Sequence, residues 1–255
     1  MSILANDHSD PGTYLESVGN RILGEVLNRL PKTGSRPYLD HLLRDYPERG
    51  GKRFRPALIL LCCEMMGGDP EDAVVSATAL ELFHNFALIH DDIEDSSEMR
   101  RGSQTLHRIH GIPLAINAGD AMLALGFEML ADSPHIQDSQ LRDVVSTIGE
   151  MVRHVAEGQQ EDFEFEDRVS VSEDEYISMI AGKTSAMFET CAETGAILAG
   201  ADTNTVANMA DWGLNLGLCF QIMDDYIDMT SDTETLGKPA GSDIVQGKRT
   251  LIAIH

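Results

Sequence analysis

The sequence predicts an all-α protein, a single-domain bundle of long antiparallel helices around a central cavity. Apolar residues recur at three- and four-residue intervals through most of the chain, and short alternating runs are rare. The 255 residues, of which 42% are hydrophobic, are enough for one good-sized core. Because no linker, tandem repeat or low-complexity block interrupts this pattern, we expect one domain over residues 1–255.

The expected helices are bounded by recognisable start and stop signals. Gly67–Asp69 ends one helix and Pro70 opens the next. Pro56 is expected to open another helix, and Ser172 with Glu175 forms a capping box. The expected helical ranges are 12–30, 38–45, 54–67, 71–95, 112–132, 138–163, 173–199, 203–230 and 242–254.

Two of these helices, 71–95 and 203–230, are apolar on nearly all sides, as the stretches AVVSATALELFHNFALIH and GLNLGLCFQIM illustrate. A helix that is hydrophobic all round is buried. We therefore expect both helices in the core. Each of them ends in a burst of aspartates, which is where the informative chemistry begins.

The composition excludes several classes of partner. Lys and Arg number 19 against 42 Asp and Glu, which gives a formal net charge of −23, and such a surface repels nucleic acid and anionic lipid. No stretch reaches the roughly 18 uninterrupted apolar residues of a membrane span, and the N-terminus lacks a basic start. Cys62, Cys63, Cys191 and Cys219 show no CxxC spacing and are interpreted as buried free thiols. We expect a cytoplasmic protein without stable membrane insertion.

The two bursts of aspartates, 91–95 and 224–228, both read DDxxD. On a helix, residues three and four apart lie along one edge, so several carboxylates face the same way. Carboxylates this close repel one another unless a cation lies between them, and hard oxygen ligands suit Mg²⁺. One such cluster would fit an exposed acidic helix end equally well. Two copies, each after a long apolar run, favour metal binding, and the ligand pattern of an EF-hand is missing.

Basic residues occur beside glycine in several short segments. Glycine lets the backbone approach a phosphate, and Lys and Arg bind it. Each Gly-Lys pair alone is more often an ordinary turn. Together with two metal clusters, they indicate a cleft for two diphosphates. The segments are Gly50–Pro56, Arg100–Gly102, Gly182–Thr184, Gly237–Lys238 and Gly247–Thr250.

These segments resemble the motifs of the trans-isoprenyl diphosphate synthases (polyprenyl synthetases), in the order that the family has them. The resemblance covers the chain from about residue 50 to its end and implies the isoprenoid synthase fold. The matching segments are GKRFRP at 51–56, HNFALIHDD at 84–92, DDIED at 91–95 with RRG at 100–102, GKTSAMFE at 182–189, FQIMDDYID at 220–228 and LGKPAGSDIVQGKRT at 236–250.

The resemblance implies a role for each matching residue. Isopentenyl diphosphate would be bound by Lys52, Arg55, His84 and Arg101, and the allylic diphosphate by Arg100, Lys183, Thr184, Gln221, Lys238 and Lys248. Mg²⁺, with about three ions per active site, would be held first by Asp91, Asp95 and Asp224, with Asp92, Asp225 and Asp228 assisting directly or through water. The first three aspartates, with Lys183 and Lys238, would be catalytic. Taken alone, His84 and Gln221 would more often be hydrogen-bonded core residues.

The implied reaction is a head-to-tail condensation of isopentenyl diphosphate with dimethylallyl, geranyl or farnesyl diphosphate. Metal ions offset the charge that grows on the leaving diphosphate, and the double bond of isopentenyl diphosphate attacks the allylic cation. The released diphosphate is the expected base, and apolar helix walls exclude water.

Residues that precede the first aspartate cluster are expected to set the length of the product. Phe86 lies roughly 7.5 Å along the helix from Asp91. Phe86 and Phe83 would block the path of the growing tail, whereas the small Ala87 leaves it open. This pattern resembles geranylgeranyl synthases, with farnesyl synthases next. The alternative is that Phe86 merely packs in the core.

Two other functions fit parts of the sequence. A class I terpene cyclase has the same fold but needs no GKRFRP segment, and its second metal site usually replaces some aspartates. A non-catalytic subunit of a heteromeric synthase typically loses one aspartate cluster. The family continues beyond GKRT, so we expect the chain to lack the family's C-terminal helices, and Gln246 stands where the family often has an acidic residue. The resemblance also implies a homodimer.

Overall fold

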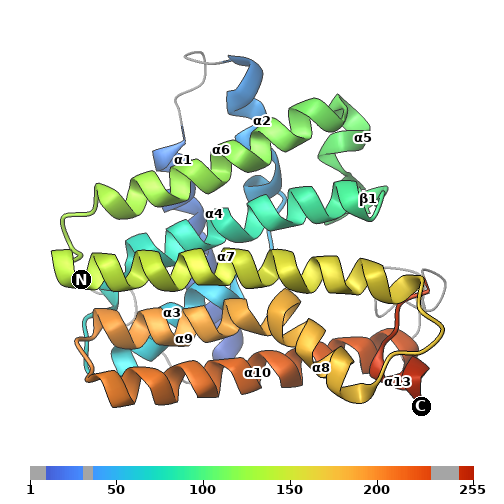
Figure 1. Ribbon diagram of the computed structural model, residues 1–255. Coiled ribbons are helices and arrows are strands. Elements are labelled where there is room, and N and C mark those ends of the chain that lie inside the picture. Colours follow the sequence, from blue (N-terminus) through green and yellow to red (C-terminus); the bar gives the residue numbers. More distant parts are fainter. Residues whose placement is uncertain (1–9, 31–36, 231–246) are drawn as a thin grey trace. The chain divides into compact units, whose positions relative to one another are not determined.

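The computed structural model describes residues 10–30, 37–230 and 247–255, and this part of the chain is almost entirely helical (Figure 1). The prediction of an all-α fold is confirmed. The chain divides into two compact units, Met1–Val145 with Ile197–Gly200 and Ser146–Ala196 with Ala201–His255. The predicted single domain around a central cavity depends on how these two units join. It therefore stays a prediction.

The first unit is built around one long helix, α4. Its start follows the sequence signals, because the Asp69 side chain accepts a hydrogen bond from the Glu71 amide at 3.0 Å and Pro70 occupies the first turn. α4 packs against α1 and α3 and most extensively against α6. The elements of this unit are α1 (Pro11–Arg29), α2 (Pro37–Glu48), α3 (Phe54–Met65), α4 (Pro70–Glu94), β1 (Met99–Arg100), β2 (Ser103–Gln104), α5 (Leu106–His110), α6 (Ile112–Ala131) and the start of α7 (Asp138–Glu166).

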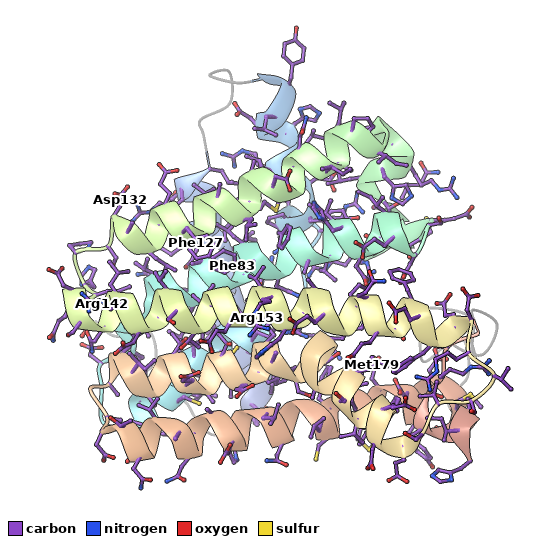
Figure 2. The ribbon with its side chains drawn as sticks, in the orientation of Figure 1. Phe83, Phe127, Asp132, Arg142, Arg153 and Met179 are labelled. Carbon is purple, nitrogen blue, oxygen red and sulfur yellow. The ribbon has the colours of Figure 1, made fainter. Side chains whose placement is uncertain are left out.

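Glycines on α6 let this helix approach α4 closely. A Cβ atom at Gly126 would lie 2.7 Å from the ring of Phe83, and one at Gly119 would lie 2.5 Å from His90 Nε2. Phe83 also contacts Phe127, with 4.9 Å between the ring centroids (Figure 2). Side chains of α4 therefore fill the positions that a larger residue on α6 would occupy.

A two-stranded hairpin follows α4, and the sequence did not predict it. Met99 pairs with Gln104 and Arg100 with Ser103 in antiparallel register. The two turn residues both have positive φ, 51° at Arg101 and 76° at Gly102, as the twist of a two-residue hairpin demands. The hairpin thus holds two arginines just beyond the end of α4.

The second unit contains the rest of α7, α8 (Glu173–Ile180), the π-helical turn η1 (Ala181–Ser185), α9 (Ala186–Leu198), α10 (Thr203–Thr230) and α13 (Leu251–Ile254). The predicted capping box is confirmed, because the Glu175 amide donates to Ser172 Oγ at 3.3 Å and the Ser172 amide donates to Glu175 Oε2 at 2.9 Å. The core of this unit includes Phe165, Val171, Tyr176, Met179 and Ile180.

A π-helical turn interrupts the helix expected over 173–199, and it carries Lys183 and Thr184. Turns of this kind are frequent at functional sites. Two glycines make room for it. A Cβ atom at Gly158 would collide with the Lys183 amide, and one at Gly217 would lie 2.5 Å from Ser185 Cα. Glycine is therefore required on both neighbouring helices.

One local prediction was confirmed and another was wrong. The third helix begins at Phe54, as its range predicted, and Pro56 lies in its first turn. Residues 247–250 are not helical although they fall in the range 242–254, whose residues 242–246 lie outside the described part of the chain. Thr250 instead caps the short α13, where its hydroxyl accepts from the Ala253 amide at 3.4 Å.

The helix α10 is not buried on all sides. Within the described residues Trp212, Phe220, Met223, Tyr226 and Ile227 are exposed, and so is Cys219, whereas Cys62, Cys63 and Cys191 are buried as expected. Composition reports how apolar a helix is, but not which segment covers it. This is why the prediction failed for α10 and held for α4.

Two helices pass a length and composition test for membrane crossing, α4 with 67% of its apolar window buried and α6 with 39%. A mostly buried core helix of a globular protein passes the same test. The length and composition of α4 are therefore weak evidence for a membrane span, since α4 is the core helix of its unit.

Candidate active site

The first aspartate cluster lies in the last turn of α4 and at its C-cap. Asp91 and Asp95 are partly exposed, whereas Asp92 is completely buried. The C-terminal end of a helix carries a partial negative charge, which disfavours further carboxylates there. A cation at this helix end therefore gains from the side chains and from the helix itself.

Asp92 is held on both of its oxygen atoms. The hydroxyl of the buried Tyr46 donates a short hydrogen bond to Oδ2. Arg100 donates to Oδ1 through Nε at 2.9 Å and through Nη2 at 2.6 Å, and its Nη2 also lies 3.4 Å from Asp91 Oδ2. Burial raises the pKa of Tyr46, and the bond to Asp92 raises it further, so this hydroxyl stays protonated and keeps donating.

Two predicted ligands of isopentenyl diphosphate, Arg55 and Arg101, lie near a third, His84. Burial, with Arg55 and Arg101 among the nearby cations, lowers the pKa of His84 well below its usual value. His84 is therefore neutral at physiological pH and can donate a hydrogen bond to an anion without carrying charge. Lys52, the fourth predicted ligand, is exposed and lines a groove of about 370 Å³ that α1 also lines.

A buried ion pair supports this group of cations. Arg53, with a φ of 48°, donates to the carboxylate of Glu81 through Nη1 and to the Pro47 carbonyl through Nη2 at 2.6 Å. Asn85 donates to the same carboxylate at 3.0 Å and accepts from Arg101 Nη1 at 3.4 Å. The loop that carries GKRFRP is thus tied to the middle of α4.

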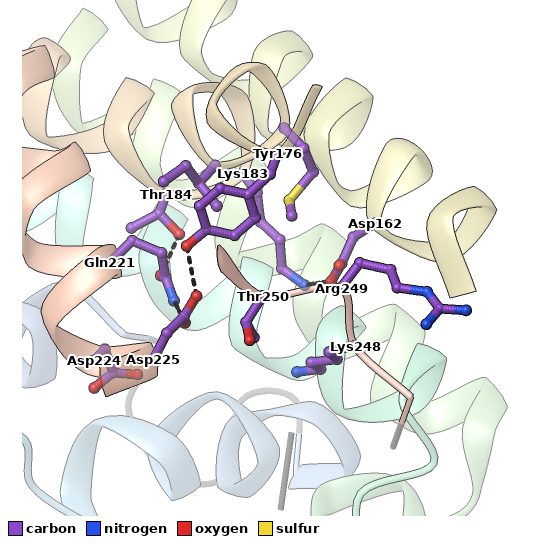
Figure 3. A pocket seen from close by; sticks show the side chains of 12 residues that line it. Asp162, Tyr176, Lys183, Thr184, Gln221, Asp224, Asp225, Lys248, Arg249 and Thr250 are labelled. Atoms are coloured by element: carbon purple, nitrogen blue, oxygen red, sulfur yellow. Dashed lines mark hydrogen bonds and ion pairs between the residues drawn. The ribbon is translucent and has the colours of Figure 1, made fainter. Parts of the chain in front are cut away.

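The second aspartate cluster lies in the last two turns of α10. Asp224 is exposed, whereas Asp225 and Asp228 are buried. The hydroxyl of Tyr176 donates to Asp225 Oδ2 at 2.5 Å, and Gln221 Nε2 donates to Oδ1 at 2.8 Å (Figure 3). Thr184 Oγ1 in turn donates to Gln221 Oε1 at 2.8 Å.

A pocket of about 150 Å³ opens beside this cluster, and charged groups of both signs line it (Figure 3). Lys183 Nζ lies 2.5 Å from Asp162 Oδ2, and Lys248 lines the same pocket. The structure therefore brings together four of the predicted ligands of the allylic diphosphate, Lys183, Thr184, Gln221 and Lys248, beside Asp224. Arg100 belongs to the other unit, and Lys238 lies outside the described residues.

The carboxylates suit a metal ion that shares its coordination with a ligand. In the part of the chain that is described, no three Asp, Glu, His or Cys side chains converge closely enough to hold an ion. Mg²⁺ usually binds through one or two carboxylates and completes its shell with water and substrate phosphates. The accessible oxygens of Asp91 and Asp224 fit that mode, in which the diphosphate itself contributes ligands.

The predicted chain-length residues differ in their surroundings. Phe83 is completely buried in the contact with α6 described above. Phe86 is partly buried and stacks edge-on against His90, with 4.7 Å between the ring centroids, and Ala87 is also partly buried. Phe86 thus has more freedom than Phe83 to line a path for a substrate.

The sequence analysis missed five residues of these sites: Tyr46, Arg53, Glu81, Asp162 and Tyr176. Arg53 lies inside GKRFRP and was visible only as one more cation. The others stand in helices, and their partners are 21 to 49 residues away in sequence. Nothing in the local pattern distinguishes them from ordinary core residues.

An all-α fold whose core helix ends in an aspartate cluster beside two hairpin arginines is that of a prenyltransferase with the isoprenoid synthase fold. The sequence profile described as "Polyprenyl synthetase" matches residues 36–255. The chain belongs to the polyprenyl synthetase family, as the resemblance of its motifs predicted.

Several relatives are similar over most of the chain. It is 41% identical over 242 residues to the short chain isoprenyl diphosphate synthase of Methanothermobacter thermautotrophicus, an alignment that covers 94% of this chain and 72% of the relative. It is 39% identical to the geranylgeranyl diphosphate synthase of Sulfolobus acidocaldarius, over 94% of this chain and 71% of that one. The crystal structure of geranylgeranyl pyrophosphate synthetase from Pyrococcus horikoshii superposes with a TM-score of 0.89 at 40% identity, over 95% of this chain and 75% of that chain.

Proposed function

We propose that the chain elongates prenyl diphosphates by joining isopentenyl diphosphate to an allylic diphosphate in a Mg²⁺-dependent reaction. One observation carries the proposal. Each of the two DDxxD clusters lies at the C-terminal end of a long helix, with an accessible aspartate, Asp91 or Asp224, beside a buried partner. Geranylgeranyl diphosphate is the favoured product and farnesyl diphosphate the next, in line with the names of the similar proteins.

The residues of the two units divide the chemistry between them. Arg55, His84 and Arg101 bind the diphosphate of isopentenyl diphosphate, and Lys183, Thr184 and Lys248 bind that of the allylic substrate. Asp91 and Asp95 in one unit and Asp224 in the other would hold Mg²⁺, which would supply positive charge to offset that of the leaving diphosphate. As the allylic carbon–oxygen bond breaks, the double bond of isopentenyl diphosphate forms the new carbon–carbon bond. The proton that is then lost passes to the released diphosphate, which is the proposed base.

Two rival functions are disfavoured by particular residues. A terpene cyclase has no second substrate and no use for the group of Arg55, His84 and Arg101. A non-catalytic subunit has no need for two clusters whose buried aspartates are both held by hydrogen bonds. A cytoplasmic homodimer is also proposed, and the half-exposed apolar helix α6 supports a second copy as its cover.

The two diphosphate sites are distinguishable by kinetics. Arg55→Ala is expected to raise the KM for isopentenyl diphosphate more than that for the allylic substrate, and Lys183→Ala is expected to do the reverse, because each removes a cation from one site only. Initial rates with each substrate varied in turn give the two constants. Arg108→Ala is the control, since its side chain is 46% exposed and pairs only at the surface with Glu98. Equal effects on both constants would contradict the assignment.

Phe86→Ala is expected to lengthen the product while most of the turnover is kept. Phe86 is partly buried, five residues before Asp91, so its removal opens the path of the growing tail. Product chain length by chromatography and thermal unfolding of the same variant measure the outcome. An unchanged product together with lowered stability would mean that Phe86 is a core residue.

A further inference from the structure

The two aspartate clusters share a support that their motif does not encode. In each cluster the second aspartate is withdrawn from solvent, with 0% exposure at Asp92 and 6% at Asp225. In each, a tyrosine from a distant helix donates its hydroxyl to Oδ2, Tyr46 of α2 for Asp92 and Tyr176 of α8 for Asp225. Both tyrosines are themselves buried, at 0% and 1% exposure. The same arrangement therefore occurs once in each unit.

The other oxygen of each buried carboxylate is also occupied. Asp92 Oδ1 accepts two N–H groups of Arg100, and Asp225 Oδ1 accepts from Gln221, one turn earlier on the same helix. The Tyr46 hydroxyl in turn accepts from the Leu106 amide at 3.4 Å, which ties the support to the start of α5. Hydrogen bonds on both oxygens therefore fix the direction of each buried carboxylate.

The first aspartate of each cluster is accessible to solvent, in contrast to the buried second one. The side chain of Asp91 is 26% exposed, and Asp224 is exposed on the surface of its unit. Neighbouring residues on a helix point about 100° apart, so fixing the direction of one carboxylate also fixes the rotation of the helix end that carries the other. A fixed direction matters because Mg²⁺ demands nearly octahedral geometry.

We propose that Tyr46 and Tyr176 are positioning residues for the metal sites, and that each acts through the buried aspartate to which it donates. The proposal rests on the proposed function, since it assumes that both clusters bind Mg²⁺ with a diphosphate. The hydroxyl of each tyrosine acts through the buried aspartate on the accessible one. Partners of this kind in other metal sites typically affect metal affinity about 10- to 100-fold.

The test is calorimetric titration of Mg²⁺ in the presence of inorganic diphosphate, which needs no turnover. Tyr46→Phe and Tyr176→Phe remove only the hydroxyl, and each is expected to weaken Mg²⁺ binding about 10-fold or more without changing the number of ions. Tyr38→Phe is the matched control, because this tyrosine is 87% exposed. The Mg²⁺ affinity of this variant is expected to equal that of the wild type. Thermal unfolding of every variant separates a loss of folding from a loss of binding.

A double-mutant cycle tests whether Tyr46 acts through Asp92. If Tyr46 acts through Asp92, the variant Tyr46→Phe/Asp92→Asn binds Mg²⁺ no more weakly than Asp92→Asn alone. The inference would be overturned if the losses of Mg²⁺ affinity of the two single variants multiplied in the double variant. It would also be overturned by a Tyr46→Phe variant with lowered stability and unchanged affinity. If one tyrosine variant fails to fold, the other still decides. A wild-type protein without Mg²⁺-dependent diphosphate binding would instead overturn the proposed function itself.

Discussion

Asp91→Ala and Asp224→Ala are each expected to lower turnover by about 100-fold or more, because each removes a ligand to the ions that offset the charge of the leaving group. The steady-state rate at saturating substrates and Mg²⁺ measures this loss. Both side chains reach solvent in their units, so their replacement by alanine leaves folding intact. The loss of turnover is then due to the loss of a metal ligand and not to unfolding of the protein.

Two control variants carry the same change of charge on the same helices. Asp72→Ala alters a half-exposed carboxylate at the start of α4, and Asp211→Ala alters an exposed one on α10. Both are expected to keep nearly full activity. If Asp91→Ala or Asp224→Ala turned over substrate as fast as these controls, the two-cluster account would be wrong.

Glu81→Gln is expected to destabilise the protein by about 3–5 kcal/mol, because it leaves the guanidinium of Arg53 buried without its counter-charge. The two side chains are only 2% and 3% exposed, so water cannot replace the lost partner. Urea-induced unfolding followed by circular dichroism gives the free energy. We also expect Lys52 and the first turn of α3, which carries Arg55, to become more mobile.

The matched control for this variant is Glu71→Gln. Glu71 pairs with Arg21 at the surface, where the side chains are 38% and 36% exposed. A surface ion pair contributes about 0–1 kcal/mol, so little change in stability is expected. Similar small losses of unfolding free energy in both variants would show that the Arg53–Glu81 pair stabilises the fold no more than a surface ion pair does.

The sequence predicted those parts of the site whose signals are local. Asp69 with Pro70 marked the start of α4, its apolar run predicted burial, and the DDxxD pattern identified the cluster at its end. The Ser172–Glu175 capping box placed the start of α8 in the same way. In each case the interacting residues lie within one helical turn of one another.

The parts that the sequence could not predict depend on distant partners. The partners of Tyr46 and Tyr176 are 46 and 49 residues away, so no local pattern reveals them. The positive φ of Arg101 is unusual for arginine, and its side chain is held by the Tyr46 carbonyl at 2.9 Å. The π-helical turn at 181–185 depends on Gly158 and Gly217 of other helices. Burial of the second aspartate in each cluster follows from such contacts and not from the motif.

The most direct test of the proposed reaction uses labelled isopentenyl diphosphate. The protein is incubated with it and with dimethylallyl, geranyl or farnesyl diphosphate in turn, with Mg²⁺ or with EDTA, and the products are identified by chain length. We expect label to enter longer all-trans prenyl diphosphates, chiefly geranylgeranyl diphosphate, only when Mg²⁺ is present. Cyclic hydrocarbons formed from an allylic diphosphate alone, or no incorporation of label with any primer, would contradict the proposed function.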